Sequence, residues 1–202
     1  MKIILIKIFI FSLILLPCIK TQAQLLDSIT LSREPVYANI TEALKNPDKV
    51  YKLDLHKKKL KEIPKEVFTF KNLQELNLSK NKINKIPKDI EFLTKLEVFD
   101  ISSNNIDSVP AAIGKLINIK KLILNQNEIA KLPPEIGNLL KMTFLDMWGN
   151  EIQELPKEII KLKSTLKVLD LRVISIKEVL QEEMEQQLPN TKIFFSMSCN
   201  CD

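Results

Sequence analysis

Apolar residues recur along this chain at a fixed interval. Within each full copy of the pattern, the first, fourth, sixth, eleventh, fourteenth, eighteenth and twenty-first residues are apolar. All 35 such positions hold Leu, Ile, Val, Phe or Met. The full copies begin at Val50, Leu73, Leu96, Ile119 and Met142, and an irregular sixth copy begins at Leu166. A fixed period of this length predicts a solenoid, in which each copy forms one coil and stacks on the next.

Each copy divides into a strand-like half and a turn-like half. The first half alternates apolar and polar residues, which is the period of a half-buried strand. The second half contains a proline, at Pro64, Pro87, Pro110, Pro133 and Pro156. Because proline suits the first turn of a helix and the apolar spacing after it is helical, we expect a short helix or 3₁₀ turn there. The strands of stacked coils should then form a parallel sheet.

The unit resembles the leucine-rich repeat in its 23-residue class. Residues 73–95, LQELNLSKNKINKIPKDIEFLTK, fit the pattern LxxLxLxxNxIxxIPxxIxxL, and the match extends from residue 50 to about residue 171. The resemblance implies an α/β fold: a right-handed solenoid with a curved parallel β-sheet on its concave face and short helical or 3₁₀ turns on its convex face. It also implies a binding scaffold.

An asparagine occupies the ninth position of four copies, as Asn81, Asn104, Asn127 and Asn150. In the family this side chain points inward and bonds backbone groups of adjacent coils. A turn at this place would otherwise leave buried N–H and C=O groups unpaired, which costs free energy. Lys58 and Ile174 stand at the equivalent positions of the first and sixth copies, so we expect this ladder of amides to end at both ends of the solenoid.

Residues 1–23 have the features of a secretory signal peptide. Lys2 and Lys7 supply a positive start, residues 8–16 form a mainly apolar run, and Ala23 precedes a candidate cleavage site. The run is shorter than the roughly 20 residues of a membrane-spanning helix. We therefore expect an exported protein that begins at Gln24. The alternative is a lipid anchor at Cys18.

The remaining chain divides into caps and repeats. Residues 24–49 are expected to form an N-terminal cap with a short helix at 41–45 that begins near Thr41. Residues 50–165 hold the five full repeats, and residues 166–196 hold the degenerate sixth repeat and a C-terminal cap. In this cap, helical spacing predicts a helix over 176–188, followed by a strand over 191–196. Residues 197–202 are a tail.

The charge of the chain changes once the leader is set aside. The leader contains three lysines and no acidic residue, so its removal lowers the formal net charge from +5 to +2. This balance does not favour nucleic acid as a partner. Lysines are spread along the chain with acids between them, which predicts a solvated outer face.

Candidate chemistry is sparse. The single histidine, His56, stands at an exposed strand position, and the three glycines form no phosphate-binding loop. Asp146 and Asp170 should lie about 5 Å apart on adjacent strands, a separation also found in retaining glycosidases. An acidic stripe for binding or solubility is the preferred interpretation, because no loop encloses the pair. We expect no catalytic, cofactor or metal site and no small-molecule substrate.

The tail ends in two cysteines, Cys199 and Cys201. An exported protein can form disulfides, so a local or intermolecular disulfide is one interpretation. An ordinary tail is another, and a metal site shared with a second chain is a third.

The third, fifth and seventh residues of each strand segment should face the concave side. The N-terminal half of this face is polar, whereas the C-terminal half contains the only tryptophan. Exposed apolar patches with a polar rim are typical of interaction sites, and Trp and Arg are common at their centres. The predicted protein-binding residues are Val98, Lys121, Ile123, Phe144, Asp146, Trp148, Val168, Asp170 and Arg172.

These features favour an exported, non-enzymatic protein that binds a protein ligand through its concave face. Two alternatives remain open at this point. One is a lipid-anchored or surface protein with an adhesive or architectural role. The other is a recognition subunit of an enzyme complex.

Overall fold

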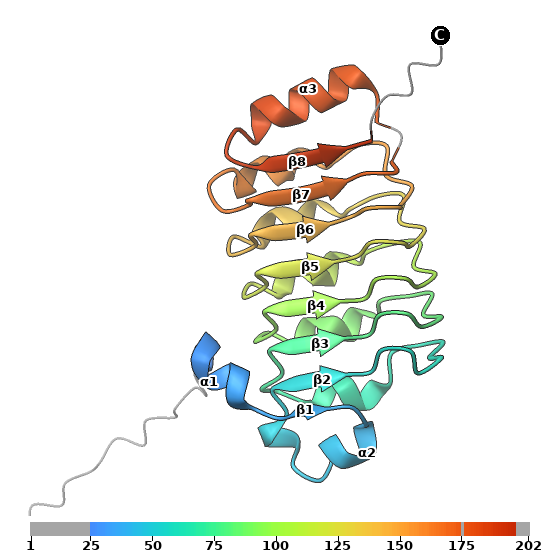
Figure 1. Cartoon of the computed structure of the whole chain (residues 1–202), viewed down its shortest axis with the longest axis vertical. Coiled ribbons are helices and arrows are strands. Elements are labelled where there is room, and N and C mark those ends of the chain that lie inside the picture. The colour runs from blue at the N-terminus through green and yellow to red at the C-terminus, as the bar shows by residue number, and fades with distance from the viewer. Residues whose placement is uncertain (1–24, 175, 197–202) are drawn as a thin grey trace, which may run out of the picture.

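The computed structural model describes residues 25–174 and 176–196, which form a curved stack of coils whose strands make one parallel sheet along one side (Figure 1). The eight strands follow one another across the sheet in the order of the chain. They are β1 (Val36–Tyr37), β2 (Lys52–Asp54), β3 (Glu75–Asn77), β4 (Val98–Asp100), β5 (Lys121–Ile123), β6 (Phe144–Asp146), β7 (Val168–Leu171) and β8 (Lys192–Phe195). The predicted solenoid with a concave parallel sheet is thus confirmed.

The register of the sheet repeats the period of the sequence. Val98 of β4 pairs with Lys121 of β5, which pairs with Phe144 of β6, so each step equals one repeat. From β6 to β7 and from β7 to β8 the step is one residue longer, as in the pairing of Val168 with Lys192. The extra residue between β6 and β7 lies in the turn before β7, where the 3₁₀ helix η6 is one residue longer than η5 of the preceding coil. Equivalent side chains therefore remain aligned from coil to coil.

The convex side consists of short 3₁₀ helices, as predicted. The five that belong to the repeats are η2 (Lys65–Thr69), η3 (Lys88–Phe92), η4 (Ala111–Lys115), η5 (Pro134–Asn138) and η6 (Lys157–Leu162). Each repeat proline lies one residue earlier than expected, at the N-cap rather than in the first turn. Pro87, for example, has φ −72° and ψ 159°, and its carbonyl accepts the first bond of the turn from the N–H of Ile90.

The 3₁₀ helices of neighbouring coils pack closely enough to require small residues. A Cβ atom added to Gly137 would lie 2.4 Å from the carbonyl oxygen of Glu158 and 2.9 Å from its Cβ. Gly114 has a similar contact with Glu135 of the next coil. These two glycines are therefore needed for close approach between coils.

The core is a column of the apolar positions that define the period. Of the 35 positions, 33 are buried; the exceptions are Leu60 in the first repeat and Leu155 in the fifth, which are partly buried. Both lie toward the ends of the stack, where a coil has fewer neighbours. The pattern of burial matches the prediction from periodicity.

The N-terminal cap contains more structure than the sequence indicated. Helix α1 (Ser28–Arg33) and strand β1 precede helix α2 (Ile40–Ala43) and a 3₁₀ turn, η1 (Pro47–Lys49). The cap helix begins earlier than predicted, because Asn39 rather than Thr41 accepts the N–H groups at its start. The cap is attached to the repeats through Gln74, whose buried amide bonds both the N–H and the C=O of Leu26 at 2.9 and 3.1 Å.

The C-terminal cap has the two predicted elements. Helix α3 (Glu178–Gln187) covers the end of the column, where Met184 and Leu188 are buried. Strand β8 then returns to extend the sheet beside β7. None of the helices in residues 25–174 and 176–196 has the length and apolar character needed to cross a membrane. The predicted leader with its alternative anchor Cys18, and the tail with Cys199 and Cys201, lie outside the described residues.

Candidate functional site

The concave face carries three rows of side chains that alternate with the buried strand residues. On β6, Leu145 points into the core, whereas Phe144 and Asp146 on either side of it remain partly exposed. The third row lies just beyond the strand ends and includes Trp148 and Arg172. Because the strands are in register, the predicted binding residues of β4 to β7 form one continuous surface.

The carboxylates and amides of the middle row bond the backbone at the end of each strand. Asp146 accepts the N–H of Trp148 at 3.1 Å, and Asp170 accepts the N–H of Arg172 at 3.1 Å. The same bond recurs in the first three repeats, at Asp54, Asn77 and Asp100. The acidic stripe therefore has a structural role that the sequence analysis did not predict: it satisfies backbone donors where the chain leaves the sheet.

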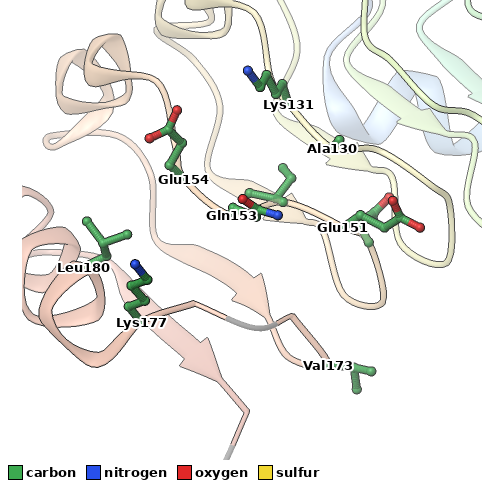
Figure 2. Close-up of a pocket in the computed structure, with 10 residues that line it drawn as sticks. Ala130, Lys131, Glu151, Gln153, Glu154, Val173, Lys177 and Leu180 are labelled. Carbon is green, nitrogen blue, oxygen red and sulfur yellow. The ribbon is translucent and has the colours of Figure 1, made fainter.

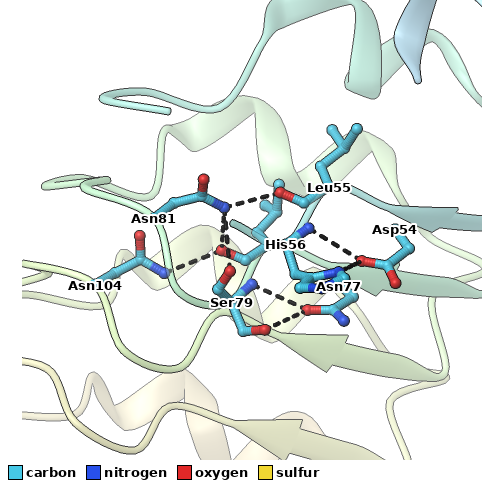
Figure 3. A network of polar contacts seen from close by, with 8 residues as sticks. Asp54, Leu55, His56, Asn77, Ser79, Asn81 and Asn104 are labelled. Atoms are coloured by element: carbon cyan, nitrogen blue, oxygen red, sulfur yellow. Dashed lines mark hydrogen bonds and ion pairs between the residues drawn. The ribbon is translucent and has the colours of Figure 1, made fainter. Parts of the chain in front are cut away.

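The polar contacts behind the strand ends connect each coil to its neighbours (Figure 3). Asn81 donates to the carbonyl of Leu55 in the preceding coil at 2.9 Å and to that of Leu78 in its own coil at 2.8 Å. Its Oδ1 accepts the N–H of Leu60 at 3.0 Å. Asn104, Asn127 and Asn150 repeat this arrangement, and all four side chains are buried or nearly so. These amides hold the coils at a fixed distance and so keep the concave rows aligned.

The C-terminal half of the concave face is the more apolar half. Phe144, Trp148 and Val168 are each partly exposed, as are Val98 and Ile123. Lys121 and Arg172 are exposed beside them. Within the described residues, the indole N–H of Trp148 makes no hydrogen bond, although its backbone N–H does. The ring therefore presents both apolar surface and an available donor.

Strand β8 adds a residue to this surface that the sequence analysis missed. Phe194 pairs in register with Asp170 and so continues the middle row. Arg172 lies over its ring at 5.5 Å, and Lys192 lies over it at 4.7 Å, both within cation–π range. Phe194 follows Asp170 at almost the repeat spacing, but this signal in the sequence becomes apparent only when β8 is known to extend the sheet in parallel.

Charged groups on this surface are held by their neighbours. Arg172 donates to both oxygens of Asp170, at 3.0 Å to Oδ1 and at 2.6 Å to Oδ2, and this contact raises the pKa of Arg172. Burial is the main reason that the pKa of Asp146 is raised above its ordinary value, while the amide of Asn125 donates to it at 2.6 Å. The surface therefore combines a fixed cation, partly buried carboxylates and apolar rings.

Features of a catalytic or metal site are few. In the described part of the chain, no three His, Cys, Asp or Glu side chains come together in a way that could hold a metal ion. Asp146 and Asp170 are register neighbours as expected, but each already bonds backbone and side-chain donors. His56 lies beside Asp54, with 2.8 Å between Nδ1 and Oδ1. These contacts favour structural roles for all four residues.

A groove of about 880 Å³ lies where the regular repeats end (Figure 2). The fifth repeat contributes Glu151, Gln153 and Glu154, and the start of the C-terminal cap contributes Lys177 and Leu180. The sixth copy has Ile174 where the second to fifth copies have asparagine, so the ladder of amides does not continue into it. The groove lining is mixed in charge and does not continue the apolar surface of the concave face.

Comparisons with known proteins agree with this architecture. A family model described as leucine rich repeat matches residues 48–106. A leucine-rich repeat protein of Leptospira interrogans has 33% sequence identity, with a TM-score of 0.68, over 81% of this chain and 46% of that chain. The comparison with curated proteins returned no match.

Two further solved structures share the fold. Internalin InlF of Listeria monocytogenes has a TM-score of 0.66 at 21% identity, over 76% of this chain and 44% of that one. The leucine-rich repeat ectodomain of the membrane receptor kinase GASSHO1/SCHENGEN3 of Arabidopsis thaliana, in complex with Casparian strip integrity factor 2, has a TM-score of 0.58 at 26% identity. That match covers 71% of this chain and 18% of the receptor. The chain thus spans less than half the length of each of these three structures.

Proposed function

Because this chain belongs to the leucine-rich repeat family, we propose that it is an exported, non-enzymatic protein that binds another protein through the C-terminal half of its concave face. The proposed contact surface contains the nine residues identified from the sequence, from Val98 to Arg172, together with Phe194 of β8. We also propose the domain organisation expected from the sequence: a leader at 1–23, an N-terminal cap at 24–49, five repeats at 50–165, a degenerate sixth repeat with a C-terminal cap at 166–196, and a tail at 197–202.

The observation that carries this proposal is the exposure of aromatic side chains on one face. Phe144 and Trp148 in the coil of β6, and Phe194 of β8, are all partly exposed, and β7 pairs with both of these strands. Leaving aromatic surface in water costs free energy that a partner would recover on binding. The charged residues Lys121, which pairs with Phe144, and Arg172, which lies over Phe194, would then orient the partner.

The comparisons support a binding role without identifying the ligand. The Arabidopsis receptor ectodomain is a leucine-rich repeat structure that was solved in complex with another factor. The fold therefore serves as a recognition scaffold in at least that protein. Export is supported by the leader, which combines lysines at its start with an apolar run. The intact mass of the protein from its native cells would distinguish a chain that begins at Gln24 from one acylated at Cys18.

Replacement of Trp148 by alanine tests the proposed surface. Truncation of a tryptophan at the centre of an interface commonly costs at least about 2 kcal/mol, or roughly thirtyfold in affinity. Folding should be little affected, because the ring is outside the apolar column. The experiment compares thermal melts and affinities for a partner captured from native extracts by the wild-type protein.

Phe92→Ala is the matched control, since Phe92 is a 49% exposed aromatic residue on the opposite, convex side. The control should bind as the wild type does. A Trp148→Ala protein that melts normally and binds with unchanged affinity would move the site away from this surface. A large drop in its melting temperature would instead show that the ring is part of the core.

A further inference from the structure

The loops that follow the strands line one lateral edge of the solenoid. Lysines are concentrated at the N-terminal end of this edge. In each repeat this loop comprises positions eight to thirteen. The loop at 57–62 has four lysines and one glutamate, and the loop at 80–85 has three lysines and no acid. The loops at 103–108, 126–131 and 149–154 together have one lysine and four acids. Along this edge, therefore, the positive charge is concentrated in the first two coils.

Stacking of the coils brings the two lysine-rich loops side by side. The N–H of Lys57 donates to the carbonyl of Ser79 at 3.0 Å, and the N–H of Lys82 donates to the carbonyl of Leu60 at 2.7 Å. Lys57 and Lys80 consequently occupy equivalent positions of adjacent coils. Facing like charges on adjacent strands destabilise a sheet, and the same repulsion applies here between the loops.

The positive charge of these loops is not neutralised by the protein itself. The seven lysines of what we name the basic edge are all exposed: Lys57, Lys58, Lys59, Lys61, Lys80, Lys82 and Lys85. Among residues 25–174 and 176–196, the ion pairs involve none of these side chains. Glu62 is the one acid in the two loops, and the nearby Asp54 is already paired with His56. An external anion is therefore the natural counter-charge for the edge.

We propose that the basic edge binds a linear anionic polysaccharide, recognised through its sulfate or carboxylate groups. This site is separate from the concave surface proposed above and does not depend on it. The edge contains lysines and no arginine, which favours attraction between point charges over the bidentate geometry that arginine provides. It contains no aromatic residue on which the bases of a nucleic acid could stack.

The shape of the charge distribution favours a polymer chain over a membrane surface. The next three loops of the same edge contain Asp107, Glu128, Glu151 and Glu154. A flat anionic bilayer that covered the edge would face these carboxylates as well as the lysines. A narrow chain can cross the first two coils alone, where its anions would meet lysines from both loops.

The test measures binding of the full-length protein to dextran sulfate, carboxymethyl dextran and uncharged dextran at about 0.15 M salt, where charges are screened over roughly 8 Å. The edge variant is Lys57→Gln, Lys59→Gln, Lys80→Gln and Lys82→Gln. The matched control removes four exposed lysines elsewhere, through Lys115→Gln, Lys131→Gln, Lys157→Gln and Lys161→Gln. Vesicles with and without phosphatidylserine form a separate arm.

We expect the wild-type protein to bind at least one charged dextran and not the uncharged one. Since exposed ion pairs contribute modestly but add together, the edge variant should lose at least about tenfold in affinity. The control should lose less than about threefold, and binding by the wild type should weaken more steeply with salt than binding by the edge variant. A second variant, Lys58→Gln, Lys61→Gln and Lys85→Gln, should also bind more weakly.

Three results would overturn the proposal. Equal losses in the edge variant and the control would show that only net charge matters. Tighter binding to phosphatidylserine vesicles than to either charged dextran would assign the edge to a membrane. Failure of the wild-type protein to bind either charged dextran would leave the edge as a solvated surface.

Discussion

Replacement of Asn104 by leucine should lower the free energy of unfolding by about 1–3 kcal/mol. Three carbonyls accept from its Nδ2: Leu78 at 3.1 Å, Ile101 at 3.0 Å and Ser102 at 3.1 Å. Its Oδ1 accepts the N–H of Ile83 at 2.9 Å. These bonds span the coil of the third repeat and the one before it, so their loss acts on the contact between coils.

The four partners of this amide are not equally affected by the change. Each carbonyl has a second donor, because Asn81 bonds Leu78, Asn127 bonds Ile101 and the N–H of Lys80 bonds Ser102. The N–H of Ile83, in contrast, has Asn104 as its single acceptor within the described residues, and Ile83 is fully buried. The cost of the substitution therefore comes mainly from one orphaned donor.

Urea denaturation followed by circular dichroism measures this cost. The midpoint should fall while the slope with denaturant stays constant, because the surface exposed on unfolding does not change. Asn105→Leu is the matched control. Asn105 is exposed, and its side-chain amide donates to Glu128 at 3.2 Å, its one bond within the described residues. This substitution should therefore change the free energy of unfolding by no more than about 0.5 kcal/mol. Equal midpoints for Asn104→Leu and the wild type would refute the reasoning.

Asn104→Asp provides an independent readout through pH. A carboxylate at this site would face carbonyl oxygens in a buried environment, so its pKa in the folded state should lie above the unfolded value of about 3.9. Because the pKa of this carboxyl would be higher in the folded state, its protonation would stabilise the native state below the unfolded pKa. That stabilisation would be lost as pH rises through the folded pKa. The aspartate variant should therefore be less stable at pH 7 than at about pH 4, relative to the leucine variant at the same pH.

Two other substitutions test packing and electrostatics. Gly137→Ala should lower the free energy of unfolding, measured in urea, by about 1–3 kcal/mol, because the added Cβ would collide with Glu158. A variant as stable as the wild type would show that the 3₁₀ helices can move apart. The pKa of Asp146 is raised, mainly by burial. The contribution of Asp146 to the free energy of unfolding should therefore be largest at low pH and should decline as pH rises from the ordinary pKa of 3.8 through the raised pKa. Asp146→Asn should remove this part of the pH dependence. If the variant and the wild type showed the same dependence of stability on pH between about pH 4 and 7, the prediction would be wrong.

The sequence predicted which residues lie on the concave face, but not all of the contacts that those residues make. Periodicity placed Phe144 and Trp148 on one face, because side chains alternate along a strand. It did not assign a structural role to Asp146, since a bond from a carboxylate to the N–H two residues later depends on how the chain turns at the strand end. Phe194 was missed because its membership of the face requires β8 to pair with β7.

The N-terminal cap shows the same limit. Strand β1 has two residues, Val36 and Tyr37, and no counterpart at the repeat spacing. So short a segment has no periodicity of its own, and it becomes a strand only by pairing with β2. The docking of Leu26 against Gln74 likewise joins residues 48 positions apart.

Hydrophobic periodicity was enough to predict the solenoid, the register of its repeats and its core. A repeating unit with seven apolar positions can bury those side chains only if equivalent positions stack, so the coil follows from the pattern. The contacts between polar and charged residues of different coils became known only from the folded structure. The lysines at 57–61 and 80–85 lie one repeat apart in the chain, and stacking places them side by side without a counter-charge. Contacts of this kind depend on the distances between side chains of neighbouring coils, and hydrophobic periodicity does not specify those distances.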